Sequence, residues 1–289
     1  MSEDQFDEDK DAPPVGPKAF EGELPRKGRF ARGLTLRAVI PNAITAAALC
    51  SGLTGVRFAI EAVGPNGEHG DWEMAAYAVL LAGVLDGIDG RIARLLKAQS
   101  RFGAELDSLA DSISFGVAPA LILFLWTLQD LPRFGWIAGL AFALCCALRL
   151  ARFNAQIDVD EQPHKSAGYL TGVPAPMGAA LGALPMFLWL ASGNEMFREP
   201  VVVAIWLALI GFLMISNIAT LSWSLIRPRR SWRLGFIAFV GILFALLLIE
   251  PWWTLVAIFG GYLALTPYSI SSYAKIRRLR AARASTPQP

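Results

Sequence analysis

The sequence predicts an all-α protein, a polytopic transmembrane helical bundle of about eight spans with both termini in the cytoplasm. Of its 289 residues, 54% are hydrophobic, and the mean hydropathy is +0.45. The apolar residues come in long runs near the ~20 residues that a spanning helix needs. Short polar segments separate the runs, and basic residues gather on alternate segments. These features favour a membrane bundle over one or two soluble domains of the same length.

Eight apolar runs mark the expected spans. They lie at residues 36–61, 72–97, 107–128, 134–154, 172–192, 199–225, 232–249 and 252–273. Only Glu250 and Pro251 separate the last two runs, so it stays open whether these form separate helices. Residues 1–17 are acidic and predict disorder. Residues 18–37 are basic, which leaves a short helix on the membrane surface as an open alternative. We expect no cleavable signal peptide, since the first apolar stretch begins only near residue 38.

The distribution of Lys and Arg gives the orientation of the spans, because cytoplasmic loops are enriched in these residues. If the spans alternate from a cytoplasmic amino terminus, all but three of the 26 Lys and Arg residues fall on the inner side. The exceptions are Arg57, Arg133 and Arg198. A seven-span chain would place the basic carboxyl-terminal tail outside, against the same rule.

Cysteine, histidine and charge usage exclude several classes of site. The three cysteines all fall within expected spans, which indicates reduced, packed thiols rather than disulfides or a zinc site. His69 and His164 lie on opposite faces of the membrane in this topology, which argues against a histidine metal site or a Ser/His/Asp triad. The net charge of +2 carries little information, and the arginines flank apolar spans without interleaved aromatics. We therefore expect no nucleic-acid partner.

Four aspartates at helical spacing form the main chemical signal. Asp86 and Asp89 are three residues apart, and Asp107 and Asp111 are four apart, so each pair occupies one face of a helix. Gly103 marks a turn between the two helices, which brings all four to the cytoplasmic membrane boundary. Carboxylates beside hydrocarbon are costly and imply a strong partner. Two divalent cations would balance the four charges, and oxygen-only ligands favour Mg²⁺ or Mn²⁺ over zinc. Such a pair suits phosphoryl transfer.

Residues between the two aspartate pairs suit a nucleotide diphosphate. Gly90 has no side chain and would let a nucleotide approach the helix closely. Arg94 lies one turn further on and can pair with phosphate, and Ser100 can donate a hydrogen bond. A single pair of acids would more often be a solvated helix face. A cation transporter whose acids line an ion path is the alternative of a different class.

The pattern D-x2-D-G-x2-A-R-x8-G-x3-D-x3-D fits the chain without a gap and resembles the signature of the CDP-alcohol phosphotransferases. It is carried by Asp86, Asp89, Gly90, Ala93, Arg94, Gly103, Asp107 and Asp111. The resemblance implies that the first three aspartates hold metals, and that Asp111 completes the second metal site and acts as general base. It also implies contacts to the CDP-linked donor of the transferred group, which would come from Asn42, Thr45, Gly90, Arg94 and Ser100.

Weaker features resemble the phosphatidylserine synthase subfamily of bacteria and archaea. They are the segments SLADSISFGVAPA (108–120), ALRLARFN (147–154) and GVPAP (172–176). This resemblance implies an inner-membrane enzyme, with its active site facing the cytoplasm, that makes phosphatidylserine and CMP from CDP-diacylglycerol and L-serine. It also makes a homodimer an open expectation. The segment SNIATLS (216–222) lacks a basic residue that the subfamily would have there.

A serine acceptor needs a cation for its carboxylate. Arg149 and Arg152 stand one turn apart at the cytoplasmic end of the fourth span and could supply it, with Asn154 as a further contact. Marking the inner end of the span is their alternative role. Sibling enzymes that use glycerol 3-phosphate, an inositol phosphate or choline stay as alternatives. In this interpretation residues 1–35 are a tail, 36–225 the catalytic core, 226–275 additional helices and 276–289 a basic tail.

Overall fold

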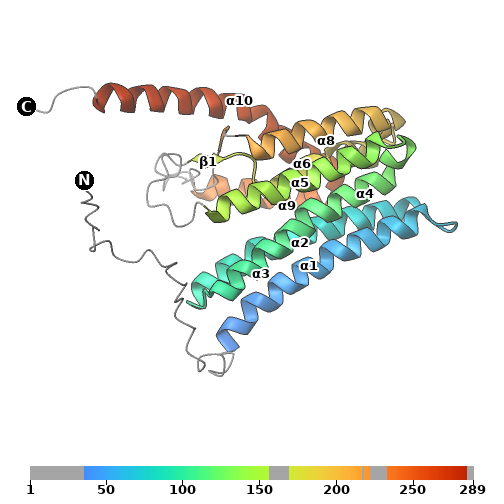
Figure 1. The fold of residues 1–289 in the computed structure, drawn as a ribbon, viewed down its shortest axis with the longest axis horizontal. Coiled ribbons are helices and arrows are strands. Elements are labelled where there is room, and N and C mark those ends of the chain that lie inside the picture. The colour runs from blue at the N-terminus through green and yellow to red at the C-terminus, as the bar shows by residue number, and fades with distance from the viewer. Residues whose placement is uncertain (1–35, 156–168, 217, 222–232, 285–289) are drawn as a thin grey trace, which may run out of the picture. The chain divides into compact units, whose positions relative to one another are not determined.

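A computed structural model describes residues 36–155, 169–216, 218–221 and 233–284 (Figure 1). The chain divides into two units, Met1–Thr35 and Leu36–Pro289, and only the second contains described residues. The expected disordered tail and the alternative of a surface helix before the first span therefore lie outside the described residues.

The described residues are almost entirely helical. The helices are α1 (Leu36–Val63), α2 (His69–Leu95), α3 (Arg101–Asp111), α4 (Ala118–Trp126), α5 (Phe134–Ala155), α6 (Ala175–Gly182), α7 (Leu184–Ser192), α8 (Pro200–Ile215), α9 (Arg233–Ile249) and α10 (Pro251–Ala284). A π-helix, η1 (Ser112–Val117), joins α3 to α4, and two short 3₁₀ helices are η2 (Leu128–Asp130) and η4 (Glu195–Arg198). The two strands β1 (Tyr169–Thr171) and β2 (Ala219–Leu221) complete the set.

Several helices are long and apolar enough to cross a membrane. Within the described ranges these are Val39–Val63, Arg101–Trp126 and Phe134–Ala155, and α6 with α7 makes a fourth if this pair, bent by 42°, is one span. The helices α8 and α9 are apolar but shorter. α2 is long, but Glu73 and the aspartates near its end interrupt its apolar run. These helices agree with an integral membrane protein built as a helical bundle.

Close packing of α1 on α2 sets the position of the first aspartate pair. The two helices run side by side and form the most extensive helix contact among the described elements (Figure 1). Gly55 permits this approach, since an added Cβ would lie 3.0 Å from the carbonyl oxygen of Ala75. The Ser51 hydroxyl donates a hydrogen bond to the carbonyl of Ala78 at 2.8 Å. Small residues at the contact are typical of membrane helix pairs.

The third expected span is one continuous helical rod from Arg101 to Trp126, with η1 in its middle. The wider π-turn begins directly after Asp111, and such turns often occur at functional sites. Gly116 of η1 packs on α5, where an added Cβ would lie 3.1 Å from the Cβ of Cys146. The rod therefore lies close to α5 next to the second aspartate pair.

A small antiparallel sheet replaces the end of the sixth expected span. The prediction of one helix over residues 199–225 is wrong, because α8 ends at Ile215 and Ser216 leaves the helical conformation with φ −59° and ψ 155°. Residues 222–225 of that span lie outside the described residues. β2 then pairs with β1, with Thr171 opposite Ala219. Gly172 follows β1 with a φ of +71°, and an added Cβ would lie 2.6 Å from the Met214 oxygen. These backbone hydrogen bonds outweigh the apolar composition that suggested a longer helix.

The last two apolar runs form separate helices. α9 ends at Ile249, α10 begins at Pro251, and α10 continues to Ala284 into the expected basic tail. Residues of α10 pack on α7, where the ring of Phe187 stacks on Trp252 and on Phe259 at centroid distances of 6.0 and 6.1 Å. α9 exposes most of its side chains within the described structure.

Candidate active site

Three carboxylates converge where α2 and α3 face each other. Asp86 and Asp89 come from α2 and Asp107 from α3, and each offers one oxygen within 4.8 Å of the others. Asp89 is buried, with 4% of its surface exposed. The Thr45 hydroxyl of α1 donates a hydrogen bond to the Oδ2 of Asp89 at 2.5 Å. The helical spacing of the acids therefore produces the expected cluster.

Asp111 joins this group from the end of α3. Its carboxyl group forms a side-chain hydrogen bond with that of Asp86, and it interacts electrostatically with Asp107 and Asp89. Two carboxyl groups in such contact must share a proton or a cation. The four oxygen-bearing side chains, drawn from two neighbouring helices, suit hard divalent ions such as Mg²⁺ or Mn²⁺. The residues present therefore fit the expected metal pair.

A cavity of about 520 Å³ with both polar and apolar lining residues, which we call the donor cavity, opens beside the carboxylates. All five residues expected to contact the donor, Asn42, Thr45, Gly90, Arg94 and Ser100, line it. Asp89 and Asp107 line it too. The other lining residues are Pro41, Ala93, Ala98, Gln99, Gly103, Ala104 and Phe153.

Local geometry explains how the donor cavity keeps its shape. An added Cβ on Gly90 would meet no atom within 4 Å, so this side of α2 leaves open space for a ligand. Gly103 instead lets α1 approach, since its added Cβ would lie 2.9 Å from the Asn42 Oδ1. Ser100 caps α3 by accepting a hydrogen bond from the Gly103 amide at 3.0 Å. Arg94 donates from Nε to the Gly90 carbonyl at 3.0 Å, which holds its guanidinium along the cavity wall.

The three residues expected to bind serine, all on α5, point to different partners. Arg149 lies within electrostatic range of Asp111 and of Tyr262 from α10, and its buried Nε has no hydrogen-bond partner within the described structure. Arg152 donates to the Ile215 carbonyl at the end of α8, at 3.1 Å. Asn154 donates to the Ser108 hydroxyl of α3 at 2.8 Å. Among the described contacts of these three residues, it is therefore Arg149 that interacts electrostatically with a member of the carboxylate cluster.

Two residues near the site, Phe153 and Tyr262, are not among those predicted from the sequence. Phe153 lines the donor cavity, although it is contributed by α5 rather than by the aspartate hairpin. The sequence feature that could have indicated Phe153 is its position between Arg152 and Asn154 in the segment 147–154. Tyr262 lies near Arg149 from an apolar run in which nothing sets it apart from packing residues.

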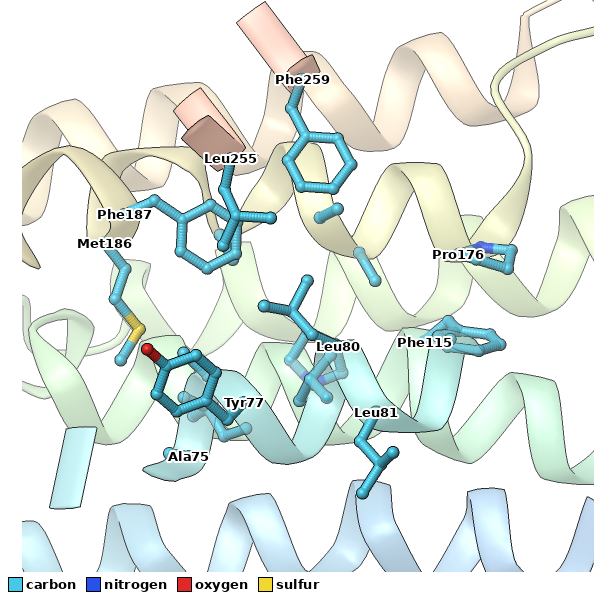
Figure 2. A pocket seen from close by; sticks show the side chains of 18 of the residues that line it. Ala75, Tyr77, Leu80, Leu81, Phe115, Pro176, Met186, Phe187, Leu255 and Phe259 are labelled. Atoms are coloured by element: carbon cyan, nitrogen blue, oxygen red, sulfur yellow. The ribbon is translucent and has the colours of Figure 1, made fainter. Parts of the chain in front are cut away.

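A second cavity, of about 600 Å³, is apolar and lies between α2, α4, α6, α7 and α10 (Figure 2). Leu80, Phe115, Phe187 and Phe259 are among the side chains around it, and its lining within the described ranges contains no charged residue. Its lining includes Val84, two positions before Asp86 on α2. Along the axis of α2, this apolar cavity therefore reaches nearly the level of the carboxylates.

Comparisons with known proteins agree with this site. Residues 38–226 match the CDP-alcohol phosphatidyltransferase family, and residues 231–267 match a family described as CDP-alcohol phosphatidyltransferase 2. The chain is 36% identical over 243 residues to the CDP-diacylglycerol–serine O-phosphatidyltransferase of Mycobacterium leprae, covering 84% of this chain and 77% of that protein. It is 32% identical over 230 residues to the protein of the same name from Helicobacter pylori, covering 78% and 88%. The chain therefore belongs to the CDP-alcohol phosphatidyltransferase family.

Proposed function

We propose that this protein is a membrane phosphatidyltransferase that converts CDP-diacylglycerol and L-serine into phosphatidylserine and CMP. The observation that carries the proposal is that Asp89 and Asp107 line the same cavity as Gly90, Arg94 and Ser100. This arrangement places a carboxylate cluster next to space and a cation for a nucleotide. The names of the M. leprae and H. pylori relatives support serine as the acceptor.

In this mechanism Asp86, Asp89, Asp107 and Asp111 would hold two divalent cations. When bound, the cations would supply neutralisation of the diphosphate and of the charge that develops on the leaving phosphate. Asp111 accepts the proton of the serine hydroxyl. The serine oxygen then forms a bond to the lipid-side phosphorus, while the bond from that phosphorus to the CMP oxygen breaks. Arg94 pairs with the phosphate of the departing CMP. Positioning of the two substrates and electrostatic stabilisation of the transition state account for most of the rate enhancement.

Arg149 supports the acceptor assignment. The half-buried guanidinium of Arg149, near Asp111, would pair with the serine carboxylate and place the serine hydroxyl beside the base. Arg152 and Asn154, whose side chains bond to Ile215 and Ser108, would act by positioning α5. A phosphorylated acceptor would call for more cations than Arg149 alone.

The same proposal includes a membrane topology. Eight spans, both termini in the cytoplasm and an active site on the cytoplasmic face of the inner membrane agree with the placement of Lys and Arg. The apolar cavity of Figure 2 would take acyl-chain carbons of the donor, while the nucleotide occupies the donor cavity. The homodimer expected from the resemblance stays a prediction.

An acceptor screen tests the proposed function. Purified protein is incubated with CDP-diacylglycerol, Mg²⁺ or Mn²⁺, and serine, glycerol 3-phosphate, inositol phosphate or choline in turn, and CMP release is measured. We expect release with serine, loss of release when a chelator removes the cations, and recovery when they are restored. Release with another alcohol alone would replace serine as the acceptor. No release with any alcohol would reject the proposed enzymatic activity and would favour the alternative of a cation transporter, in which the aspartates line an ion path.

A further inference from the structure

The final turn of α5 brings one aromatic ring to the donor cavity. Phe153 is the one aromatic side chain among the described residues that line this cavity, and the rest of the lining is small, polar or charged. As a residue, Phe153 is 44% exposed. A partly exposed aromatic ring beside a cavity of nucleotide size offers a surface on which a base can stack.

Hydrogen bonds on both sides of Phe153 hold the turn in place. Arg152 donates to the Ile215 carbonyl of α8, and Asn154 donates to the Ser108 hydroxyl of α3. Ser108 in turn donates to the Ala104 carbonyl on its own helix, and Ala104 lines the donor cavity. The position of the ring is therefore fixed against the wall of the cavity by neighbours on two other helices.

The register of α5 places the ring at the level of a base. Arg149 and Phe153 are four residues apart, so they share one face of the helix, about 6 Å apart along its axis. Arg149 lies within electrostatic range of Asp111, at the carboxylate cluster. Phe153 is therefore one turn further toward the cytoplasmic end of the helix. A nucleotide whose phosphates lie at the carboxylates would extend its base in that direction.

We infer that Phe153 binds the cytosine ring of the donor by stacking and so acts as a nucleotide-binding residue of the transferase. The inference rests on the proposed function and adds a base contact that the aspartate hairpin does not provide. The opposing interpretation is that Phe153 belongs to the belt of aromatic residues at a membrane surface. The two interpretations differ in whether the base of the ligand matters.

Two soluble ligands separate the base from the sugar phosphate. CMP contains the base, whereas ribose 5-phosphate has the sugar and phosphate without it. Binding of each to the full-length protein in detergent, with Mn²⁺ present, is measured by calorimetry, with displacement of CMP for the weaker ligand. In Phe153→Ala we expect CMP to bind roughly tenfold to hundredfold more weakly. Ribose 5-phosphate should bind as it does to the unchanged protein, and Phe153→Tyr and Phe153→Trp should retain CMP binding.

The matched control is Phe102→Ala. Phe102 is 67% exposed on the first turn of α3, near the donor cavity but outside its lining, so its loss should leave CMP binding unchanged. Equal weakening of both ligands in Phe153→Ala, or no weakening of either, would overturn the stacking role while leaving the proposed function in place. If the unchanged protein bound no CMP, the proposed function itself would fail, and the inference with it.

Discussion

At the scale of single residues, Asp111 stands out because it interacts both with the other carboxylates of the cluster and with the guanidinium of Arg149. It bonds to Asp86 on one side and lies within electrostatic range of Arg149 on the other. Replacing it by asparagine keeps the shape but removes the proton acceptor. We expect Asp111→Asn to lower kcat by about 10²–10⁴-fold, as for the loss of a general base, and to leave CMP binding largely intact. Steady-state CMP release and calorimetry check both parts, and full turnover in this variant would rule out the base.

The two arginines of α5 should separate in a kinetic comparison. Arg149 lies near Asp111, whereas Arg152 bonds to the Ile215 carbonyl. We expect Arg149→Ala to raise the KM for serine roughly tenfold to hundredfold, the cost of losing a charged hydrogen bond, with little change in the KM for CDP-diacylglycerol. Arg152→Ala should instead lower thermal stability in detergent. Equal changes in both KM values for Arg149→Ala would count against carboxylate binding.

Thr45 illustrates a residue that acts through another. Its hydroxyl bonds to Asp89, which orients a metal-binding carboxylate. We expect Thr45→Val to raise the Mn²⁺ concentration for half-maximal activity by about 10–100-fold, and Thr45→Ser to restore it. A metal titration of activity measures this shift. Thr54→Val is the control, because the exposed Thr54 hydroxyl donates to the Cys50 carbonyl of its own helix. An unshifted titration in Thr45→Val would refute the orienting role.

At the scale of elements, the α2–α3 hairpin was predictable and the sheet was not. Residues three and four apart in a helix must share a face, so the aspartate cluster and most of the donor cavity follow from local spacing. The end of α8 depends on pairing between Thr171 and Ala219, which are distant in sequence, and the apolar run around them gives no sign of it. The division of roles between Arg149 and Arg152 depends in turn on where α8 ends. That part of the site could not be predicted from helical periodicity.

The bend between β1 and α6 should be sensitive to substitution. Gly172 and Gly193 both have positive φ, but an added Cβ on Gly172 would lie 2.6 Å from a backbone oxygen, while Gly193 has open space around it. We expect Gly193→Ala to cost about 1–2 kcal/mol of unfolding free energy from the left-handed backbone alone. Gly172→Ala should cost distinctly more. Thermal unfolding in detergent compares the two variants. Equal losses of stability would show that the Met214 carbonyl can shift away from the added Cβ without an energetic cost.

At the scale of the whole molecule, the proposed topology predicts which turns a water-soluble reagent can reach. Asn66 lies between α1 and α2, Asn194 follows α7, and Lys97 lies between α2 and α3. In the proposed topology, the first two would be outside and Lys97 would be inside. With the native cysteines replaced by alanine, a membrane-impermeant maleimide should label Asn66→Cys and Asn194→Cys in intact cells. Lys97→Cys should react only after permeabilisation. Labelling of Lys97→Cys in intact cells would reverse the orientation.

The walls of the site come from different parts of the chain, and this division has a kinetic consequence. The donor cavity is bounded mainly by α1, α2 and α3, whereas Arg149 of α5 interacts with Asp111 and, on α10, with Tyr262. The nucleotide and the amino acid would thus have separate binding sites around the same aspartates, and both could be bound at the same time. Double-reciprocal plots of rate against serine, taken at several donor concentrations, should therefore intersect rather than run parallel.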